Sequence, residues 1–378
     1  MKWVLANKTL AGILGILIIL LLTATIFAVV TWSGYQSAVV TTTTHVEAGS
    51  APTPTPTPDP LGPYSILLLG HGDPGHDGGS LTDSMILAYI QPRKKSIHLI
   101  SLPRDIWVEL PLLEDGKKGY KINAAYAIGK DPKQFPNRAE AFKGEGGGGS
   151  LSKYAVATVT GLQPDYFLAV NFYAFAAGID ALGGIKVSVP QGFDDPFYPI
   201  EEEKTNSCGL SEEDIAALSA TLSGDLLIEH FGCRYEHLYF DAGSQEMDGE
   251  TALKFVRSRH STQSGNDFAR AERQQVVIEA VKKKIFTINF LPKILPFIQS
   301  LSQNIRTDID SSKLATLIGK AEELQTYTIH RVVLSEKNVL KTGRSDDRQF
   351  ILQPKEGENP NDWTATHTYI QQEVEKTE

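Results

Sequence analysis

The strongest candidates for functional residues lie in the stretch Asp248–Ile285, which is rich in arginine. Arg257 and Arg259 are two residues apart, so they share one face if Phe255–Arg259 is extended. Two further arginines follow in the same stretch. An inward-facing guanidinium needs an anionic partner, and its fork geometry suits phosphate oxygens. The cluster therefore indicates phosphate recognition.

The second half of this stretch predicts one amphipathic helix, with Asn266 or Asp267 as its N-cap. At about 100° per residue, one narrow stripe collects Arg270, Gln274, Val277, Val281 and Ile285. The opposite side, which we expect to face solvent, collects Glu272, Gln275, Glu279, Lys282 and Lys283. Arg273 lies about 60° off the stripe, so we expect it to flank the site rather than to form it.

Three carboxylates accompany the glycine-rich loop Gly70–Ser80: Asp73, Asp77 and Asp83. Carboxylates in loops commonly do no more than solvate the loop. Beside an arginine cluster they also fit Mg²⁺, which takes hard oxygen ligands, bridges phosphate oxygens and uses one or two protein carboxylates. We expect Asp83, at the start of a strand, to be the better ligand and Asp73 the second. The histidines of the same loop are a weaker metal signal because no third fixed ligand is apparent.

Other readings of these residues remain open. Arg257 and Arg259 are alternatively salt-bridge partners of the acidic segment 191–239. A lone lysine such as Lys121 is more often a surface residue than a ligand. The net charge of −9 makes the cluster local, so no nucleic-acid partner is expected. The chain has no GxxxxGK[ST] or G-x-S-x-G motif, which argues against a nucleotide P-loop and against acyl hydrolysis.

The N-terminal part predicts a membrane anchor. Thr9–Val30 carries no charge and is long enough to span a bilayer. Lys2 and Lys8 precede this run, and no Lys or Arg follows until Arg93, which places residues 1–8 in the cytoplasm. A cleaved signal peptide is the alternative, but its apolar core is usually shorter and no clear cleavage site follows. We expect a single-pass protein of the cell membrane whose main domain is extracytoplasmic.

Residues 31–63 are rich in Thr and then alternate with Pro, which predicts an extended spacer between membrane and domain. An extracytoplasmic compartment permits disulfides. Cys208 and Cys233, the two cysteines of the chain, are therefore a candidate disulfide.

From residue 64 onward the pattern predicts an α/β domain with helices on both faces of a sheet. Short apolar runs predict strands at Ser65–Leu69, Ser84–Ile90 and Ser96–Leu102. Arg104 and Asp105 follow the third strand at its tip, where functional side chains commonly lie.

Asp165–Pro190 predicts a strand, a helix and a strand, with Asn171 as N-cap and Gly183-Gly184 as the C-terminal stop. The helix is apolar nearly all round, so it either packs in the core or lines an apolar cavity. The remaining expectations are helices at 121–129, 150–160, 293–324 and 366–374, strands at 326–335 and 348–353, a flexible loop at 144–150, and an irregular acidic insertion with one short helix at 191–239.

In these segments the chain resembles the LytR-CpsA-Psr (LCP) family of membrane-anchored glycopolymer phosphotransferases. The matching segments run in the family's order from about Tyr64 to Ile285 and are ILLLG, LTDSMILAYI, SLPRDIWVELP, KINAAYAIG, DYFLAVNFYAFAAGIDALGGIKVSVP and MDGETALKFVRSRH…NDFARAERQQ. The resemblance implies a central mixed β-sheet flanked by helices, with a hydrophobic tunnel for a polyprenyl tail. It places the catalytic domain at 64–290, with 191–239 as an insertion, and leaves 291–378 as the C-terminal part of the extracytoplasmic domain.

The resemblance also implies roles for single residues. Asp83 matches the Asp of the family's R-[ST]-D-T motif and is expected to hold Mg²⁺, with Asp73 near the position of the earlier loop Asp. The residues expected to grip a pyrophosphate are Arg104, Arg257, Arg259, Arg270 and Gln274, with Lys121 nearby. Two positions depart from the family pattern. Leu81 replaces an Arg, and Gly72 stands where the loop Asp is usual, so Asp77 or His76 is an alternative to Asp73 as metal ligand.

The activity implied is transfer of a glycopolymer from a polyprenyl-pyrophosphate carrier to a hydroxyl of a cell-wall acceptor glycan of peptidoglycan type. The residues expected to act in catalysis are Asp83, Arg104, Asp105, Arg257 and Arg259, with Asp105 and Asp73 as candidates for the general base. Two alternatives are a non-catalytic or regulatory protein that binds polyprenyl phosphate or wall glycan, and a pyrophosphatase acting on the carrier.

Overall fold

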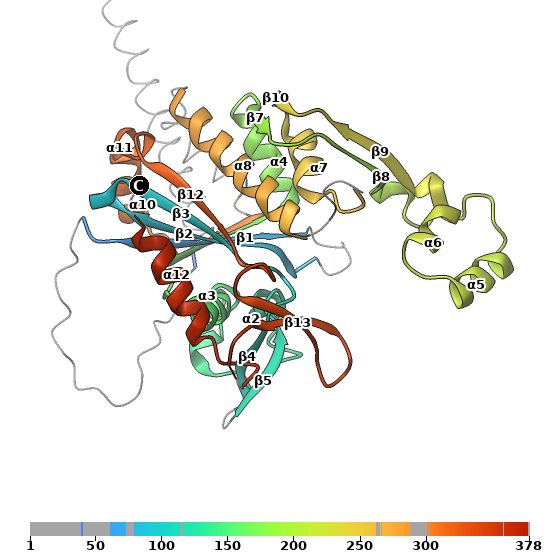
Figure 1. Ribbon diagram of the computed structural model, residues 1–378, viewed down its shortest axis with the longest axis horizontal. Coiled ribbons are helices and arrows are strands. Elements are labelled where there is room, and N and C mark those ends of the chain that lie inside the picture. Colours follow the sequence, from blue (N-terminus) through green and yellow to red (C-terminus); the bar gives the residue numbers. More distant parts are fainter. Residues whose placement is uncertain are drawn as a thin grey trace, which may run out of the picture.

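The computed structural model describes residues 39–40, 61–72, 79–113, 116–261, 265, 267–287, 301, 303–357 and 359–376. At its centre is a six-stranded sheet with the order β11-β6-β1-β2-β3-β12 (Figure 1). Its strands are β1 (Tyr64–His71), β2 (Thr82–Gln91), β3 (Ser96–Ser101), β6 (Tyr166–Asn171), β11 (Ile305–Thr307) and β12 (Thr328–Val333). β1 is parallel to β6 and antiparallel to β2, and β12 is parallel to β3. The expected mixed sheet is confirmed.

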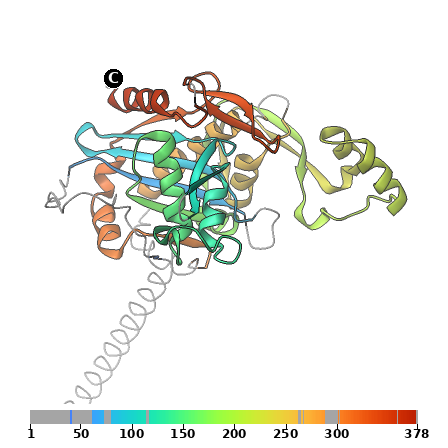
Figure 2. The same cartoon turned by 90° about the horizontal axis from the view of Figure 1, so that it is seen from below.

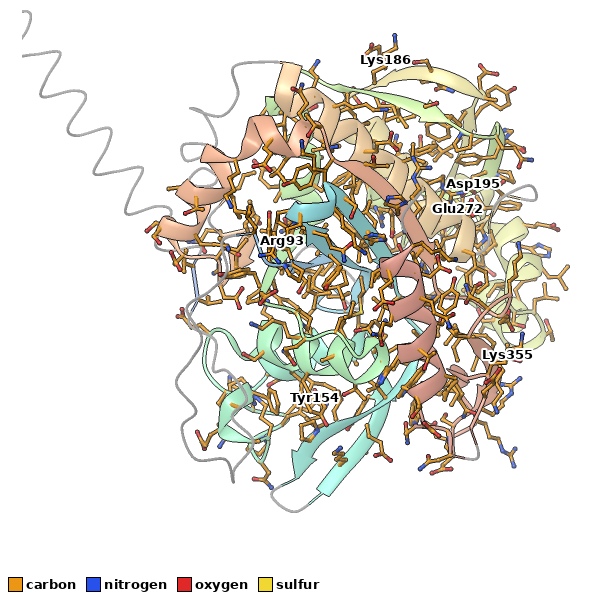
Figure 3. The ribbon with its side chains drawn as sticks, turned by 60° about the vertical axis from the view of Figure 1, so that its left-hand side comes forward. Arg93, Tyr154, Lys186, Asp195, Glu272 and Lys355 are labelled. Carbon is orange, nitrogen blue, oxygen red and sulfur yellow. A yellow bond between two sulfur atoms is a disulfide. The ribbon has the colours of Figure 1, made fainter. Side chains whose placement is uncertain are left out.

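Helices cover both faces of this sheet, as predicted. One face carries α2 (Ala124–Lys130), α3 (Gly147–Thr160) and α12 (Thr364–Glu375), which bury the inward side chains of β1 and β2 such as Leu67 and Leu87. The other face carries α4 (Phe172–Ala181), α8 (Asp267–Thr287) and α11 (Ala321–Gln325). Tyr154 of α3 and Glu272 of α8 mark the two sides of the sheet in Figure 3. The alternation of side chains along each strand thus supplies two separate cores.

The second half of the glycine-rich segment 144–150 belongs to helix α3, so the prediction of a flexible loop over this whole segment is wrong. α3 begins at Gly147, with Gly146 as its N-cap, three residues before the helix start predicted at residue 150. A Cβ on Gly147 would lie 2.3 Å from the carbonyl oxygen of Phe142, and one on Gly149 would lie 2.2 Å from the Phe167 ring. Only glycine permits such close packing of this helix end.

Two further predictions fail in the second half of the chain. Phe255–Arg259 is not extended, because α7 (Gly249–Arg257) is capped by the Asp248 side chain and continues to Arg257. Of the helix expected at 293–324, residues 293–300 and 302 lie outside the described residues. The described part is not one helix, because it contains β11 at Ile305–Thr307, followed by α10 (Ser311–Gly319) and α11. At Phe255–Arg259 the local signals themselves favour the helix, because Asp248 is a suitable N-cap.

Residues 191–240 form an arm that projects from the body (Figure 1, Figure 2). Its stem is the antiparallel pair β8 (Phe193–Pro199) and β9 (Tyr235–Phe240), and its tip holds α5 (Glu212–Thr221) and α6 (Asp225–Ile228). The disulfide Cys208–Cys233 closes the tip. The insertion expected at 191–239 is therefore irregular only between its two strands.

Three smaller strand pairs complete the fold, and sequence reasoning missed most of them. β7 (Ile185–Val189) pairs with β10 (Gly243–Met247), β4 (Trp107–Leu113) with β5 (Gly116–Lys121), and β13 (Leu340–Arg344) with β14 (Phe350–Pro354). β14 matters for the site because the backbone N–H of Leu352 donates to the carbonyl oxygen of Asp105 at 2.9 Å.

The predicted anchor at residues 9–30 lies outside the described residues, as do Asp73, His76 and Asp77. Within the part of the chain that the structure describes, no helix combines the length and the apolar character that crossing a membrane requires.

A buried histidine gives the fold a pH dependence. His98 on β3 is 1% exposed, stacks on His330 at 4.7 Å between ring centroids, and has no hydrogen-bond partner for either ring nitrogen among the described residues. Burial, together with His330 and Lys94, lowers the pKa of His98 to about 4. The unfolded chain, with an ordinary pKa of 6.5, binds this proton more readily, so stability falls as the pH falls from 6.5 towards 4.

We expect the free energy of unfolding to fall by about 2 kcal/mol between pH 7.5 and pH 5 on account of His98. Urea unfolding at the two pH values measures this fall. A His98→Phe variant has no such group to protonate and should lose that part of the pH dependence. An equal fall in this variant would contradict the assignment.

Candidate active site

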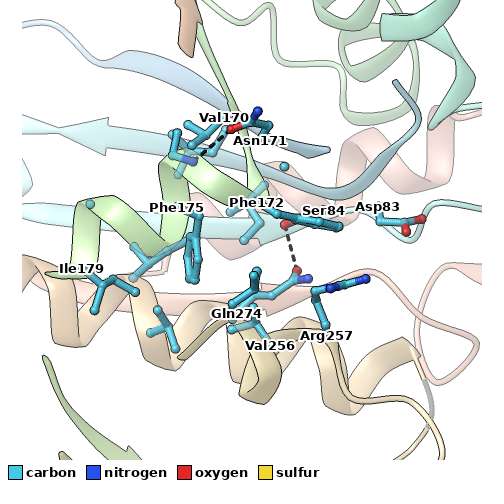
Figure 4. Close-up of a pocket in the computed structure, with 18 of the residues that line it drawn as sticks. Asp83, Ser84, Val170, Asn171, Phe172, Phe175, Ile179, Val256, Arg257 and Gln274 are labelled. Atoms are coloured by element: carbon cyan, nitrogen blue, oxygen red, sulfur yellow. Dashed lines mark hydrogen bonds between the residues drawn. The ribbon is translucent and has the colours of Figure 1, made fainter. Parts of the chain in front are cut away.

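An apolar cavity of about 680 Å³ lies between the sheet and helices α4, α7 and α8 (Figure 4). Its apolar wall comes from four elements of the sheet and from these helices, and includes Leu68, Ile86, Leu168, Val170, Phe175, Ile179, Leu182, Leu253, Val256, Val277, Ile278, Val281, Ile285 and Ile305. The open question about α4 is thereby answered, since this helix lines a cavity. The stripe predicted on α8 also lines it.

The polar side chains of the cavity gather at one end. In Figure 4, Asp83, Ser84 and Arg257 lie at this end, and Ile179 lies at the other. The polar set consists of Asp83, Ser84, Asn171, Asp195, Tyr198, Arg257, Arg259, His260, Arg270 and Gln274. The cavity therefore has one long apolar part and one cationic mouth, and four predicted residues of the α7–α8 region meet there.

Asp83 lies at the centre of the mouth. Its Oδ1 is 3.0 Å from Arg104 Nη1, and its Oδ2 is 3.1 Å from Arg259 Nη2. Burial raises the pKa of Asp83, but the guanidinium groups of Arg259 and Arg104 outweigh burial and hold this pKa below its ordinary value. Asp83 is thus an anion at neutral pH. Asp83 orients two arginines, Arg104 and Arg259, that lie far apart in the sequence.

Arg104 is held from behind by a short chain of charges. Its Nε is 3.5 Å from Asp105 Oδ2, and Asp105 Oδ1 accepts a hydrogen bond from Lys121 Nζ at 2.6 Å. Asp105 is buried, and neither it nor Lys121 lines the cavity. This geometry favours a positioning role for both residues over the catalytic role expected for Asp105 and the phosphate contact expected for Lys121.

Arg257 ends α7 with its guanidinium 4.2 Å from the centre of the Phe172 ring. Its Nη1 donates to Tyr198 Oη at 3.2 Å. Ser258 then leaves the helical conformation, which turns Arg259 back towards Asp83. Arg257 and Arg259 therefore lie at the same mouth because α7 ends between them, not because Phe255–Arg259 is extended.

α8 supplies Arg270 and Gln274, one turn apart, to the same mouth. Gln274 Oε1 accepts a hydrogen bond from Ser84 Oγ at 3.0 Å, which ties α8 to the start of β2. Arg273 does not line the cavity. It is buried and donates to the backbone carbonyls of Phe255 and Ser258, so it supports the end of α7 as expected for a flanking residue.

Gln275 corrects the prediction of a solvent-facing side on α8. Its side chain is fully buried, and Nε2 donates to the backbone carbonyls of Leu99 and Val332 and to Ser101 Oγ. α8 thus packs against β3 and β12 through an amide that satisfies backbone acceptors of the sheet. A helical period alone cannot separate such a residue from a surface glutamine.

Sequence reasoning missed several residues of the mouth. Asp195 and Tyr198 belong to the stem of the arm, and the sequence predicts only an irregular acidic insertion there. Asn171 was expected only as the N-cap of α4, a role confirmed by its bond to the N–H of Ala174 at 2.9 Å, and it also lines the cavity. His260, directly after the paired arginines, was available in the sequence but unused.

The donor set can be tested against the expected Mg²⁺. The Asp83 side chain is 41% exposed and lines the mouth, which suits an ion that takes one protein carboxylate together with phosphate oxygens. Among the described residues no group of three or more His, Cys, Asp or Glu could hold a metal ion. Asp83 therefore fits a metal shared with a phosphate ligand, and the alternative ligands Asp73, His76 and Asp77 lie outside the described residues.

Known proteins resemble this chain in sequence and in fold. A model of the LytR_cpsA_psr family matches residues 29–359. Over 254 residues the chain is 29% identical to the polyisoprenyl-teichoic acid–peptidoglycan teichoic acid transferase TagU of Oceanobacillus iheyensis, and the match covers 67% of this chain and 61% of that protein. The chain thus matches less than two thirds of this relative's length.

Two solved structures share the fold. The crystal structure of Bacillus subtilis TagV aligns with a TM-score of 0.53 and 21% identity, over 84% of this chain and 99% of TagV. The structure of TagT bound to LIIa-WTA aligns with a TM-score of 0.52 and 19% identity, over 84% of this chain and 93% of TagT. At these identities the likeness concerns the fold.

Proposed function

The chain belongs to the LytR_cpsA_psr family, and on that premise we propose that it transfers a glycopolymer from a polyprenyl-pyrophosphate carrier to a hydroxyl of a cell-wall glycan. One observation carries the proposal. A long apolar cavity ends in a mouth that contains Arg257, Arg259 and Arg270. An apolar chamber excludes ions, and an arginine cluster needs an anion, so the pair fits an amphiphile with an apolar tail and a phosphate head.

In this proposal the apolar walls of α4 and α8 hold the polyprenyl tail. The guanidinium groups at the mouth bind the pyrophosphate oxygens, and Arg104 joins them because Asp83 holds it at the same place. The protein then contributes position and charge, which are the main requirements of phosphoryl transfer. The arginines neutralise charge that builds on the leaving phosphate.

The proposed reaction exchanges one phosphorus–oxygen bond for another. The acceptor hydroxyl attacks the phosphorus that bears the glycan, the bond to the polyprenyl phosphate breaks, and polyprenyl monophosphate leaves. The hydroxyl proton passes to a general base. Asp73 is one candidate for this base and lies outside the described residues. Asp105 is less suited to this task, because its carboxylate already accepts a hydrogen bond from Lys121 Nζ at 2.6 Å.

Asp83 is the residue proposed to hold Mg²⁺ together with the pyrophosphate. When bound, the ion would supply positive charge to the phosphate oxygens. Before a ligand binds, Asp83 orients Arg104 and Arg259 instead.

We also propose that residues 9–30 anchor the protein in the cell membrane with the main domain outside. The uncharged run with lysines only before it supports this topology. The disulfide Cys208–Cys233 is consistent with an oxidising compartment.

The test uses the full chain in detergent with a polyprenyl-pyrophosphate glycan and a peptidoglycan acceptor. We expect a phosphodiester-linked product, released polyprenyl monophosphate, loss of both with EDTA and recovery with Mg²⁺. In an Asp83→Ala variant the residual transfer should no longer respond to Mg²⁺. Release of phosphate without acceptor would indicate a pyrophosphatase, and tight carrier binding without turnover would indicate a binding or regulatory protein.

A further inference from the structure

Asp195 on β8 is a fully buried carboxylate at the base of the arm and is labelled in Figure 3. Among the described residues, it accepts hydrogen bonds from one short segment of chain and from its own strand. Its Oδ2 accepts hydrogen bonds from Ser258 Oγ at 2.6 Å and from the backbone N–H groups of Arg259 at 2.9 Å and His260 at 3.1 Å. Its Oδ1 accepts from the N–H of Phe197 at 3.0 Å. One side chain thus satisfies three consecutive residues.

These three residues directly follow Arg257, at the point where α7 ends. The N–H of Ser258 still donates to the carbonyl oxygen of Lys254 in α7. The N–H groups of Arg259 and His260 follow the helix and need acceptors outside it, and the Asp195 carboxylate is a strong one. The same segment is held from the other side by Arg273, whose Nη2 donates to the carbonyl oxygen of Ser258. Asp195 and Arg273 together fix the turn that points Arg259 at Asp83.

The charge of Asp195 has a second effect at the mouth. Arg259 and Arg270 are cations, and Arg273 is a third cation that is almost fully buried. Burial is the main cause that lowers the pKa of Arg273 to about 10, and the negative charge of Asp195 acts in the opposite direction. Asp195 therefore offsets part of the cost of burying the Arg273 charge.

We propose that Asp195 is the positioning residue that holds the Arg257–Arg259 segment in the geometry that binds pyrophosphate. The inference rests on the proposed function, because it assigns a role at the same site. It also gives the arm a part in the site. β8 carries Asp195 and Tyr198, so the strand that begins the arm also supports both paired arginines.

An amide cannot replace this carboxylate. In Asp195→Asn, one of the two terminal atoms becomes a donor, which faces either the N–H of Phe197 or the three donors of the 258–260 segment. A buried donor then opposes a donor, and the segment loses its fixed conformation. Misplacing a binding group by about 1 Å is enough to cost on the order of a hundredfold in activity.

The experiment measures head-group binding and tail binding separately, by calorimetric titration of the full chain in detergent. The probes are farnesyl pyrophosphate and farnesol, which share a tail and differ in the head. We expect Asp195→Asn to weaken farnesyl pyrophosphate binding at least tenfold and to leave farnesol binding unchanged. A role confined to folding would weaken both probes together.

The matched control is Asp194→Asn, which removes the same charge from the neighbouring position of β8. Asp194 Oδ2 lies 3.2 Å from His237 Nε2, on the neighbouring strand of the stem. We expect wild-type binding of both probes by this variant. Ser258→Ala serves as a second variant if Asp195→Asn does not fold, and should weaken only farnesyl pyrophosphate, by a smaller factor.

The outcomes separate this inference from the proposed function. If the wild type binds no farnesyl pyrophosphate, the proposed function itself fails. If the wild type binds it and Asp195→Asn binds it equally well, or if both probes weaken together, the positioning role is overturned. Where only Ser258→Ala folds, unchanged discrimination between the probes in that variant overturns it as well.

Discussion

Replacing Arg259 with alanine should lower kcat/KM for glycopolymer transfer about a thousandfold. The Arg259 guanidinium lies 3.1 Å from Asp83 at the cationic mouth of the cavity, where a pyrophosphate head would exchange with the carboxylate. Removing one pre-positioned donor from a site of developing negative charge typically costs about a hundred- to a thousandfold. Here the variant also releases Asp83 from one of its two partners, so we expect the upper end of this range.

Two variants sharpen this measurement. Arg259→Lys keeps the charge but loses the planar fork, so its loss should be intermediate. Arg344→Ala removes an arginine that is exposed on β13, away from the cavity, and transfer should stay at the wild-type rate. Steady-state rates with saturating acceptor decide the matter, and an Arg259→Ala enzyme with a wild-type rate would remove this residue from the site.

Replacing Gly178 with leucine should lower the affinity of the cavity for an apolar tail about a hundredfold and leave the protein folded. Gly178 lies within α4 and lines the apolar part of the cavity. A leucine there occupies the space of about four methylene groups of a tail, which corresponds to about 3 kcal/mol and a loss of affinity of about a hundredfold. Replacing an interior helical glycine also favours the helix by up to about 1 kcal/mol, so Tm should not fall.

Gly319→Leu is the matched control for this variant. Gly319 ends α10, is exposed, and has open space where a Cβ would be added. Titration with farnesol should show wild-type affinity for Gly319→Leu and a large loss for Gly178→Leu. Equal affinity in both variants would mean that the tail lies elsewhere.

Local patterns predicted the elements that contact the ligand site most directly. The first three strands follow from short apolar runs, and Asn171 followed by an apolar stretch fixes the start of α4. The stripe on α8 that begins with Arg270 was visible because an arginine and a glutamine occupy positions that normally hold apolar residues. These features depend on residues within one turn or one strand of each other.

The rest depended on contacts between distant parts of the chain. Asp195 lies 63 residues before Ser258, and no spacing within β8 shows that its carboxylate will meet the end of α7. Gln275 reads as a surface residue until β3 and β12 supply its acceptors. The helix at Phe255 could have been predicted from the sequence. Asp248 is a suitable N-cap, and Ala252, Phe255 and Val256 have helical spacing.

The arm has a consequence for the electric field of the molecule. Residues 191–240 contain eleven of the 45 acidic residues and two of the 36 lysines and arginines, so their net charge of −9 equals that of the whole chain. The remainder is electrically neutral, which makes the protein a dipole with its negative pole on the projecting arm (Figure 1). Beside an anionic surface this dipole turns the arm away and the body inward, and the torque weakens as salt shortens the Debye length from about 30 Å at 0.01 M to about 8 Å at 0.15 M.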